Sequence, residues 1–222
     1  MKIFVVYWHP EPRSFNAAML ETICSTLASL GHEVKVSNLH RMNFDPVSSR
    51  RNFITVKEPE YFKPQAEEQF AAERNGFADD VESEIRKVEW CDLMIWQFPL
   101  WWFGLPAVLK GWVDRVFASG RIYGNGRYYE TGVFRGKRAV LSLTTGSGEA
   151  AFRPGGFNGD LAGILRPIHR GMLQFVGFDV LPPHIVYAPA RLTAEQRATE
   201  LETLSQRLRQ IVCESPIAVG AY

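Results

Sequence analysis

The chain has 222 residues, of which 46% are hydrophobic and 22% charged, and its formal net charge is +1. This length predicts one domain, and the balanced charge gives no indication of a nucleic-acid partner or an anionic membrane surface. The three cysteines lie far apart and the five histidines show no metal-ligand spacing, so we expect neither a disulfide framework nor a metal site. No segment approaches the roughly 20 apolar residues of a membrane span. We therefore expect a cytoplasmic protein without membrane insertion.

Apolar β-rich runs alternate with segments of helical spacing along the chain. The expected strands are residues 3–7, 32–39, 91–98, 137–145 and, as a strand or extended segment, 177–187. The expected helices are residues 16–30, 76–90, 106–117, 159–175 and 193–212, the last with a capping box of Thr193 and Gln196. Residues 40–75 mix proline, charge and isolated aromatics, which indicates a surface insertion. We expect a single domain over residues 1–212 and a C-terminal tail over residues 213–222.

This alternation predicts right-handed crossovers and an α/β fold, with a parallel sheet covered by helices on both faces. Five strands fit the flavodoxin-like doubly wound order 2-1-3-4-5. Ligands of such sheets bind beyond the carboxyl ends of the strands, at the switch point between strands 1 and 3. Functional residues are therefore expected in the loops that follow strands 1, 3 and 4.

The first of these loops reads HPEPRSFN. Ser14 and Asn16 stand at a helix start, where free backbone N–H groups and the helix dipole favour an anion such as a phosphate. His9 and Arg13 add positive charge there. Helix capping alone by Ser14 or Asn16 is the alternative.

The second loop belongs to the segment QFPLWWFGLPAVLKGW, residues 97–112. Pro99 and Leu100 are expected to make the turn, and the aromatic residues 101–103 to line the strand end. A flat heteroaromatic ring needs stiff apolar walls of this kind. A cluster of core aromatics is the alternative.

The third loop, TTGSGEAAF, follows the fourth strand. Gly146 and Gly148 permit close approach of a ligand to the backbone, and successive N–H groups there can form a nest for an anionic ring edge. The loop also matches the pattern G-x-G-x-x-A. A dinucleotide-binding motif, however, follows the first strand and opens a helix, and residues 153–156 extend this loop instead.

Several segments together resemble the NAD(P)H:quinone oxidoreductase (DT-diaphorase) family. They are SFNAAM, QFPLWWFGLPAVLKGWVDRVF, FRGKRAVLSLTTG, and the pieces FNGD, ILRPI and GMLQFVGFDVL. The resemblance covers most of the chain, from His9 to about Arg197. It implies a flavodoxin-like oxidoreductase that binds flavin, usually FAD with FMN possible. Such enzymes take hydride from NADH or NADPH and pass it to a quinone or another flat aromatic acceptor. It also implies a homodimer with active sites at the interface.

The same resemblance assigns the flavin-binding positions of this chain. The implied contacts are His9, Ser14, Phe15 and Asn16 on the adenosine side, Pro99, Leu100, Trp102 and Phe103 at the isoalloxazine ring, Thr144, Thr145, Gly146, Ser147 and Gly148 at its pyrimidine edge, and Arg197 near the adenine-side phosphate. The resemblance gives Trp101 no role, and we expect it to face the sheet-side core or a second subunit. Trp102 is expected to touch the ring.

The implied catalytic set departs from the family pattern. The N–H groups of Gly146 and Ser147 are expected to stabilise the reduced flavin, and Tyr123 of a second subunit to cover the substrate. A loop aromatic packed on its own subunit is the alternative for Tyr123. Known members carry a Tyr and a His after the TTG sequence, whereas this chain has Phe152 and Asn158. Phe152 has no hydroxyl to donate, so Asn158 is expected to donate a hydrogen bond to the substrate. An FMN-dependent azo- or nitroreductase and a regulatory flavoprotein of a membrane transport system are the alternatives.

Overall fold

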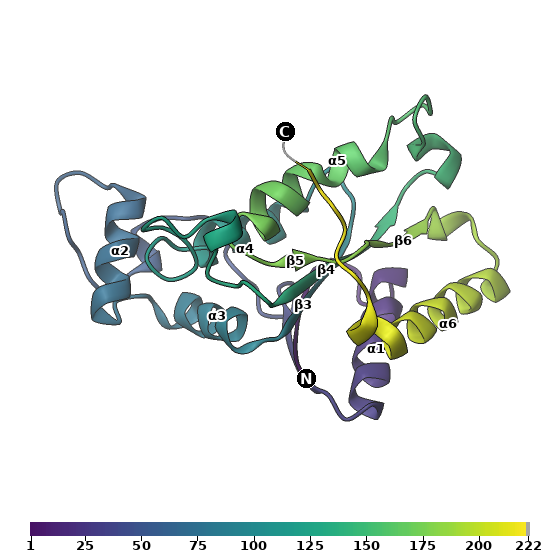
Figure 1. Ribbon diagram of the computed structural model, residues 1–222, viewed down its shortest axis with the longest axis horizontal. Helices are drawn as coiled ribbons and strands as arrows, with labels where there is room; N and C mark the ends of the chain where they lie inside the picture. Colours follow the sequence, from purple (N-terminus) through teal and green to yellow (C-terminus); the bar gives the residue numbers. More distant parts are fainter. Residues whose placement is uncertain (221–222) are drawn as a thin grey trace.

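The computed structural model describes residues 1–220 and shows one parallel sheet between two layers of helices (Figure 1). The strands are β1 Lys2–Tyr7, β2 Glu33–Asn38, β3 Leu93–Pro99, β4 Arg138–Thr145, β5 Asp179–Val180 and β6 His184–Tyr187. The helices are α1 Phe15–Ser29, α2 Pro64–Arg74, α3 Asp79–Trp90, α4 Ala107–Val116, α5 Leu161–Ile168 and α6 Ala194–Gln210. The order β2-β1-β3-β4-β5 confirms the predicted fold.

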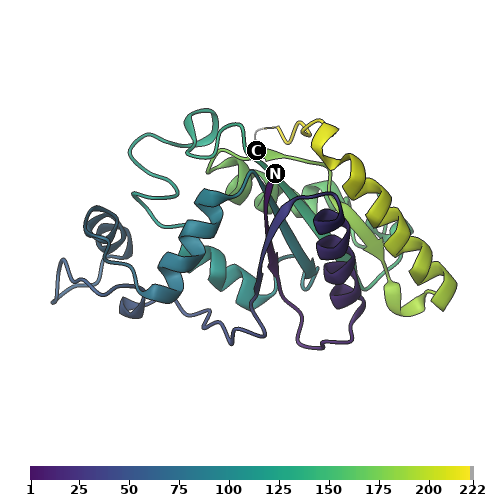
Figure 2. The ribbon, with the colours of Figure 1, turned by 90° about the horizontal axis from the view of Figure 1, so that it is seen from below.

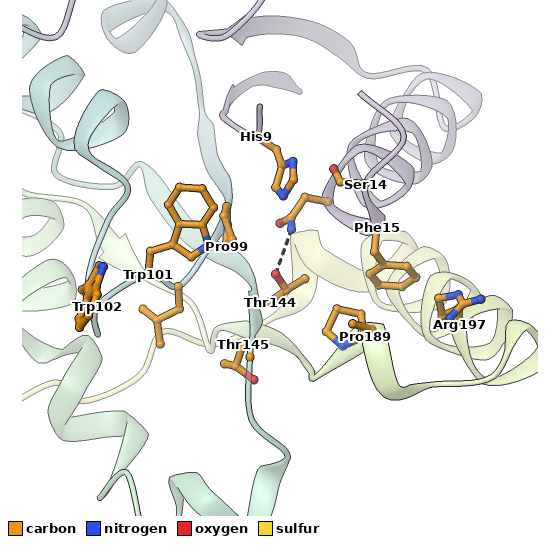
Figure 3. A pocket seen from close by; sticks show the side chains of 14 residues that line it. His9, Ser14, Phe15, Pro99, Trp101, Trp102, Thr144, Thr145, Pro189 and Arg197 are labelled. Carbon is orange, nitrogen blue, oxygen red and sulfur yellow. Dashed lines mark hydrogen bonds between the residues drawn. The ribbon is translucent and has the colours of Figure 1, made fainter. Parts of the chain in front are cut away.

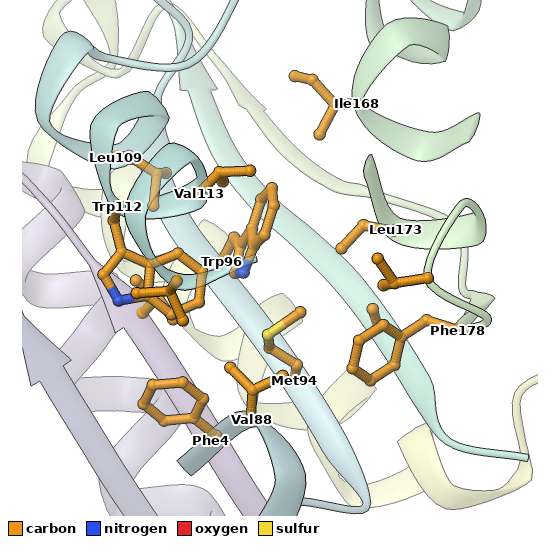
Figure 4. Packing of buried hydrophobic residues seen from close by; sticks show 14 of the residues in the cluster. Phe4, Val88, Met94, Trp96, Leu109, Trp112, Val113, Ile168, Leu173 and Phe178 are labelled. Carbon is orange, nitrogen blue, oxygen red and sulfur yellow. The ribbon is translucent and has the colours of Figure 1, made fainter. Parts of the chain in front are cut away.

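Each face of the sheet has its own hydrophobic core. Helices α1 and α6 pack together over one face, and α3, α4 and α5 cover the other (Figures 1 and 2). The centre of the larger core is an edge-to-face pair, Trp96 of β3 and Trp112 of α4, with ring centroids 6.0 Å apart (Figure 4). The indole N–H of Trp112 donates to the buried Glu84 carboxylate at 2.8 Å. These two cores fix the positions of the strand ends that carry the loops.

One strand was predicted over residues 177–187, but the structure has two short strands there. Two short strands, β5 and β6, pair in turn with β4. Pro182 and Pro183 separate them, and neither residue has an N–H group for the ladder. The helix predicted over residues 159–175 is also divided: Asp160 caps α5, and a π-helical segment, His169–Gln174, continues it.

The segment predicted as an irregular insertion, residues 40–75, contains the regular helix α2 at one end of the molecule (Figure 2). Two of its buried residues are Glu67 and Glu68, so the sequence shows no apolar stripe there. The tail also has ordered contacts, since the N–H of Ile217 donates to the carbonyl of Val180 at 2.8 Å. Within residues 1–220, no helix is both long and apolar enough to cross a membrane.

Candidate functional site

A cavity of about 650 Å³ lies beyond the carboxyl ends of β1, β3 and β4, at the predicted switch point (Figure 3). Its volume is within the range of roughly 300–1,000 Å³ that is usual for small-molecule sites. The lining residues come from four loops and the start of α6: His9, Ser14, Phe15, Asn16, Pro99, Leu100, Trp101, Trp102, Thr144, Thr145, Gly146, Pro189, Ala190 and Arg197. The three loops that the sequence predicted to be functional, after β1, β3 and β4, therefore meet at this cavity.

Asn16 joins the elements around the cavity. Its side-chain amide donates to the Thr144 hydroxyl at 2.9 Å, and its carbonyl oxygen accepts from the Gln97 side chain at 2.8 Å. Asn16 is buried, and these bonds tie the first turn of α1 to β3 and β4. The Asn16 side chain thus links three elements of the fold, and it also lines the cavity.

The cavity has positive electrostatic character. Ser14 caps α1 and accepts the Ala17 N–H at 3.2 Å, so the first turn of the helix points its positive dipole end at the cavity. Arg197 adds a full charge, and none of the described lining residues is acidic. An anionic group such as a phosphate is favoured at this side of the cavity.

His9 is tied to the backbone of the same loop. Its Nδ1 lies 3.0 Å from the Glu11 N and 3.2 Å from the Glu11 carbonyl oxygen, which leaves Nε2 for the cavity. Burial lowers the pKa of His9, and the nearby Glu11 partly opposes this shift. His9 therefore offers a neutral hydrogen-bonding group near neutral pH.

A tight turn after β3 supplies the aromatic wall. Trp101 and Gly104 exchange two backbone hydrogen bonds of 3.2 and 3.0 Å, and Trp102 and Phe103 between them have φ values of 51° and 58°. Positive φ at both central residues defines the type I′ geometry, which normally selects Asn and Gly. The turn directs Trp101 inward, where its ring meets Trp8 edge-on at 5.1 Å. Trp102 lies at the outer end and is 97% exposed.

Gly146, which follows β4, lets a ligand lie close to the backbone. A Cβ atom built on Gly146 meets no protein atom within 4 Å, although the residue lines the cavity, so the glycine leaves open space beside the backbone. The Thr145 hydroxyl donates to the Ser147 carbonyl at 2.7 Å and orders the following loop. Open backbone on one side and indole rings on another suit a planar ring, so the residues present fit a flavin.

The structure places several predicted site residues outside the cavity lining. Phe103, Ser147 and Gly148 are beside it in sequence but are not part of its wall. The backbone N–H of Asn158 donates to the Ala151 carbonyl at 2.8 Å, and Tyr123 packs near Phe175 with a ring distance of 5.6 Å.

Three lining residues were not assigned from the sequence. Trp101 faces the cavity and not the sheet-side core, because its side chain projects inward from the tight turn. Pro189 and Ala190 follow β6, whose carboxyl end joins the same edge of the sheet. The predicted fifth strand could have pointed to this loop, since ligands bind beyond the ends of all such strands.

Comparison with known proteins places this geometry in a family. A family model described as "Flavodoxin-like fold" matches residues 1–212. The chain belongs to this family. Among curated relatives of this flavodoxin-like protein, ribosyldihydronicotinamide dehydrogenase [quinone] of Pongo abelii is 39% identical over 222 residues, covering 100% of this chain and 96% of the relative. NAD(P)H dehydrogenase [quinone] 1 of Cavia porcellus is 41% identical, covering 97% of this chain and 79% of the relative.

Solved structures agree with the fold of the flavodoxin-like chain. A protein from Klebsiella pneumoniae described as a quinone reductase superposes with a TM-score of 0.94 at 38% identity. The match covers 98% of this chain and 87% of the Klebsiella chain. Among residues 1–220, no group of three or more His, Cys, Asp or Glu side chains is arranged to hold a metal ion.

Proposed function

We propose that this flavodoxin-like protein is a flavin-dependent quinone oxidoreductase that uses NADH or NADPH as the electron donor. The observation that carries the proposal is the cavity at the β1–β3 switch point, which has indole walls at one end and positive charge at the other. Identity of about 40% to quinone dehydrogenases over nearly the whole chain supports the same activity.

The cavity residues divide into groups that suit the parts of a flavin nucleotide. Trp101, Trp102 and the Pro99–Leu100 backbone would flank the isoalloxazine ring, and the Thr144–Gly146 segment would meet its pyrimidine edge. The amides that begin α1, together with His9 and Arg197, would hold the phosphates. A flavin bound in this way supplies hydride-transfer chemistry, while the protein orients the rings and excludes water.

We further propose that the bound flavin is FAD and not FMN. Phe15, Pro189 and Arg197 line the end opposite Trp102 (Figure 3). An FMN placed with its ring at the tryptophans would end at its single phosphate and leave that far end empty. The adenosine half of FAD would fill it.

The exposed aromatic wall on the substrate side supports a site that is completed by a second copy of the chain. Trp102 is 97% exposed at the cavity mouth, so one chain alone leaves the ring side open to water. We propose a homodimer in which Tyr123 of one copy covers the acceptor slot of the other, because Tyr123 does not line the cavity of its own copy. Asn158 is the proposed donor to the acceptor, and the N–H groups of Gly146 and Ser147 would stabilise negative charge on the reduced ring.

The proposal is tested by steady-state kinetics on the flavin-loaded protein. One slot used in turn by donor and acceptor gives ping-pong kinetics, with parallel double-reciprocal lines when NADH or NADPH is varied at several quinone concentrations. Azo dyes and nitroaromatics serve as the competing acceptors. A preference for these over quinones, or release of FMN and not FAD on denaturation, would contradict the corresponding part of the proposal.

A further inference from the structure

Helix α2, in the segment that looked like a surface insertion, holds the loop that carries Tyr123. The buried Glu68 carboxylate accepts the Ser119 N–H at 2.7 Å, and the Gln69 side-chain amide donates to the Ser119 hydroxyl at 3.2 Å. Gly120 lies so close to α2 that a Cβ atom added to it would be 3.0 Å from the Ala72 Cβ. The start of this loop is therefore clamped against α2 by two hydrogen bonds and a tight backbone contact.

The same helix reaches the Tyr123 side chain itself. The Gln65 side-chain amide donates to the Tyr123 hydroxyl at 3.3 Å. The Tyr123 carbonyl accepts the Gly120 N–H at 2.8 Å, which closes the loop back onto the clamped segment. On its other side the Tyr123 ring packs against Phe175 at 5.6 Å and Tyr128 at 6.4 Å. The ring is thus held from both sides while the residue remains half-buried.

Charge and burial keep the Tyr123 hydroxyl protonated. Burial raises the pKa of Tyr123, and the negative charge of Glu68 raises it further. Tyr123 is therefore protonated near neutral pH, and the Gln65 amide occupies one acceptor position of its oxygen. A hydroxyl fixed in this way can offer its proton to a carbonyl oxygen of an acceptor molecule.

We propose that α2 is the positioning element of the acceptor slot, in which Gln65 orients the Tyr123 hydroxyl and Glu68 anchors the loop that carries it. The inference rests on the proposed function, in which Tyr123 of one copy covers the quinone bound by the other. Gln65 and Glu68 are positioning residues, since they act through Tyr123 and its loop. The insertion would then set acceptor affinity without touching the flavin.

The test is a double-mutant cycle of Gln65→Leu and Tyr123→Phe in the flavin-loaded protein. Gln65 is exposed, so the leucine variant is expected to fold, whereas a truncation of the buried Glu68 risks unfolding. One uncharged hydrogen bond corresponds to a change of about threefold to tenfold, so the quinone KM should rise by this factor with kcat nearly unchanged. Amide hydrogen exchange over residues 119–124 should become faster in the same variant. Gln206→Leu, an exposed position on α6, is the matched control and should change neither quantity.

The cycle separates the two proposals. In the Tyr123→Phe background, Gln65→Leu should have no further effect, because the hydroxyl through which it acts is gone. Additive effects, or an unchanged KM together with unchanged exchange in Gln65→Leu, would overturn the positioning role. If Tyr123→Phe leaves the quinone KM unchanged in an active enzyme, the placement of Tyr123 fails and the inference fails with it. Absence of quinone reduction by the unmodified protein would instead refute the proposed function.

Discussion

Replacing Trp102 with asparagine is expected to stabilise the protein and weaken catalysis. Trp102 has a φ of 51°, a left-handed conformation that costs a bulky L-residue about 1–2 kcal/mol and that asparagine tolerates much better. Because the side chain is 97% exposed, its removal gives up almost no buried apolar area. The net gain is about 1 kcal/mol, which for a chain of this length raises Tm by roughly 2–4 °C.

Urea and thermal unfolding of the flavin-free Trp102→Asn variant measure this gain, with quinone turnover measured on the same preparation after flavin is added. Trp102→Phe is the control, since phenylalanine keeps the strained conformation and should not gain stability. Turnover should fall in the asparagine variant because the indole is one wall of the proposed ring site. A loss of stability in Trp102→Asn, with none in Trp102→Phe, would refute the strain account. It would show that a contact outside the single chain buries the aromatic ring.

Three further changes have defined outcomes. Burial lowers the pKa of His169 and of His184 to about 4, below the usual 6.5, so the unfolded chain binds more protons between these values. Stability should therefore fall as the pH drops from 6.5 towards 4, by up to about 3 kcal/mol per histidine, as urea midpoints at several pH values will show. Gly146→Val should weaken flavin binding at least tenfold by fluorescence titration, whereas Gly148→Val, which meets equally open space outside the cavity, should not. Asn16→Ala should destabilise the protein by about 1–3 kcal/mol in urea unfolding, because it leaves buried polar partners on β3 and β4 unpaired.

The sheet and its order followed from the sequence because buried parallel strands are continuous apolar runs with clear helical segments between them. Two features escaped this reasoning for physical reasons. Helix α2 buries Glu67 and Glu68, so its contacts carry no apolar periodicity. The split of the last strand depends on Pro182 and Pro183, which permit both an extended segment and two short strands.

The cavity was predictable to the level of loops, since the doubly wound order alone determines which strand ends meet. The direction of each side chain was not. Trp101 and Trp102 are neighbours of the same type, and only the turn, with positive φ at Trp102 and Phe103, sets how each ring lies at the cavity. Asn16 lines the cavity as expected, but its hydrogen bonds to Thr144 and Gln97 join distant segments, which no local pattern reveals.

The central claim is tested most directly by an anaerobic titration of the purified, FAD-loaded protein followed by visible absorption. The account predicts that one equivalent of NADH or NADPH bleaches the flavin band and that one equivalent of a quinone restores it fully. A protein that takes up neither FAD nor FMN would contradict the account. So would a reduced flavin that no quinone reoxidises.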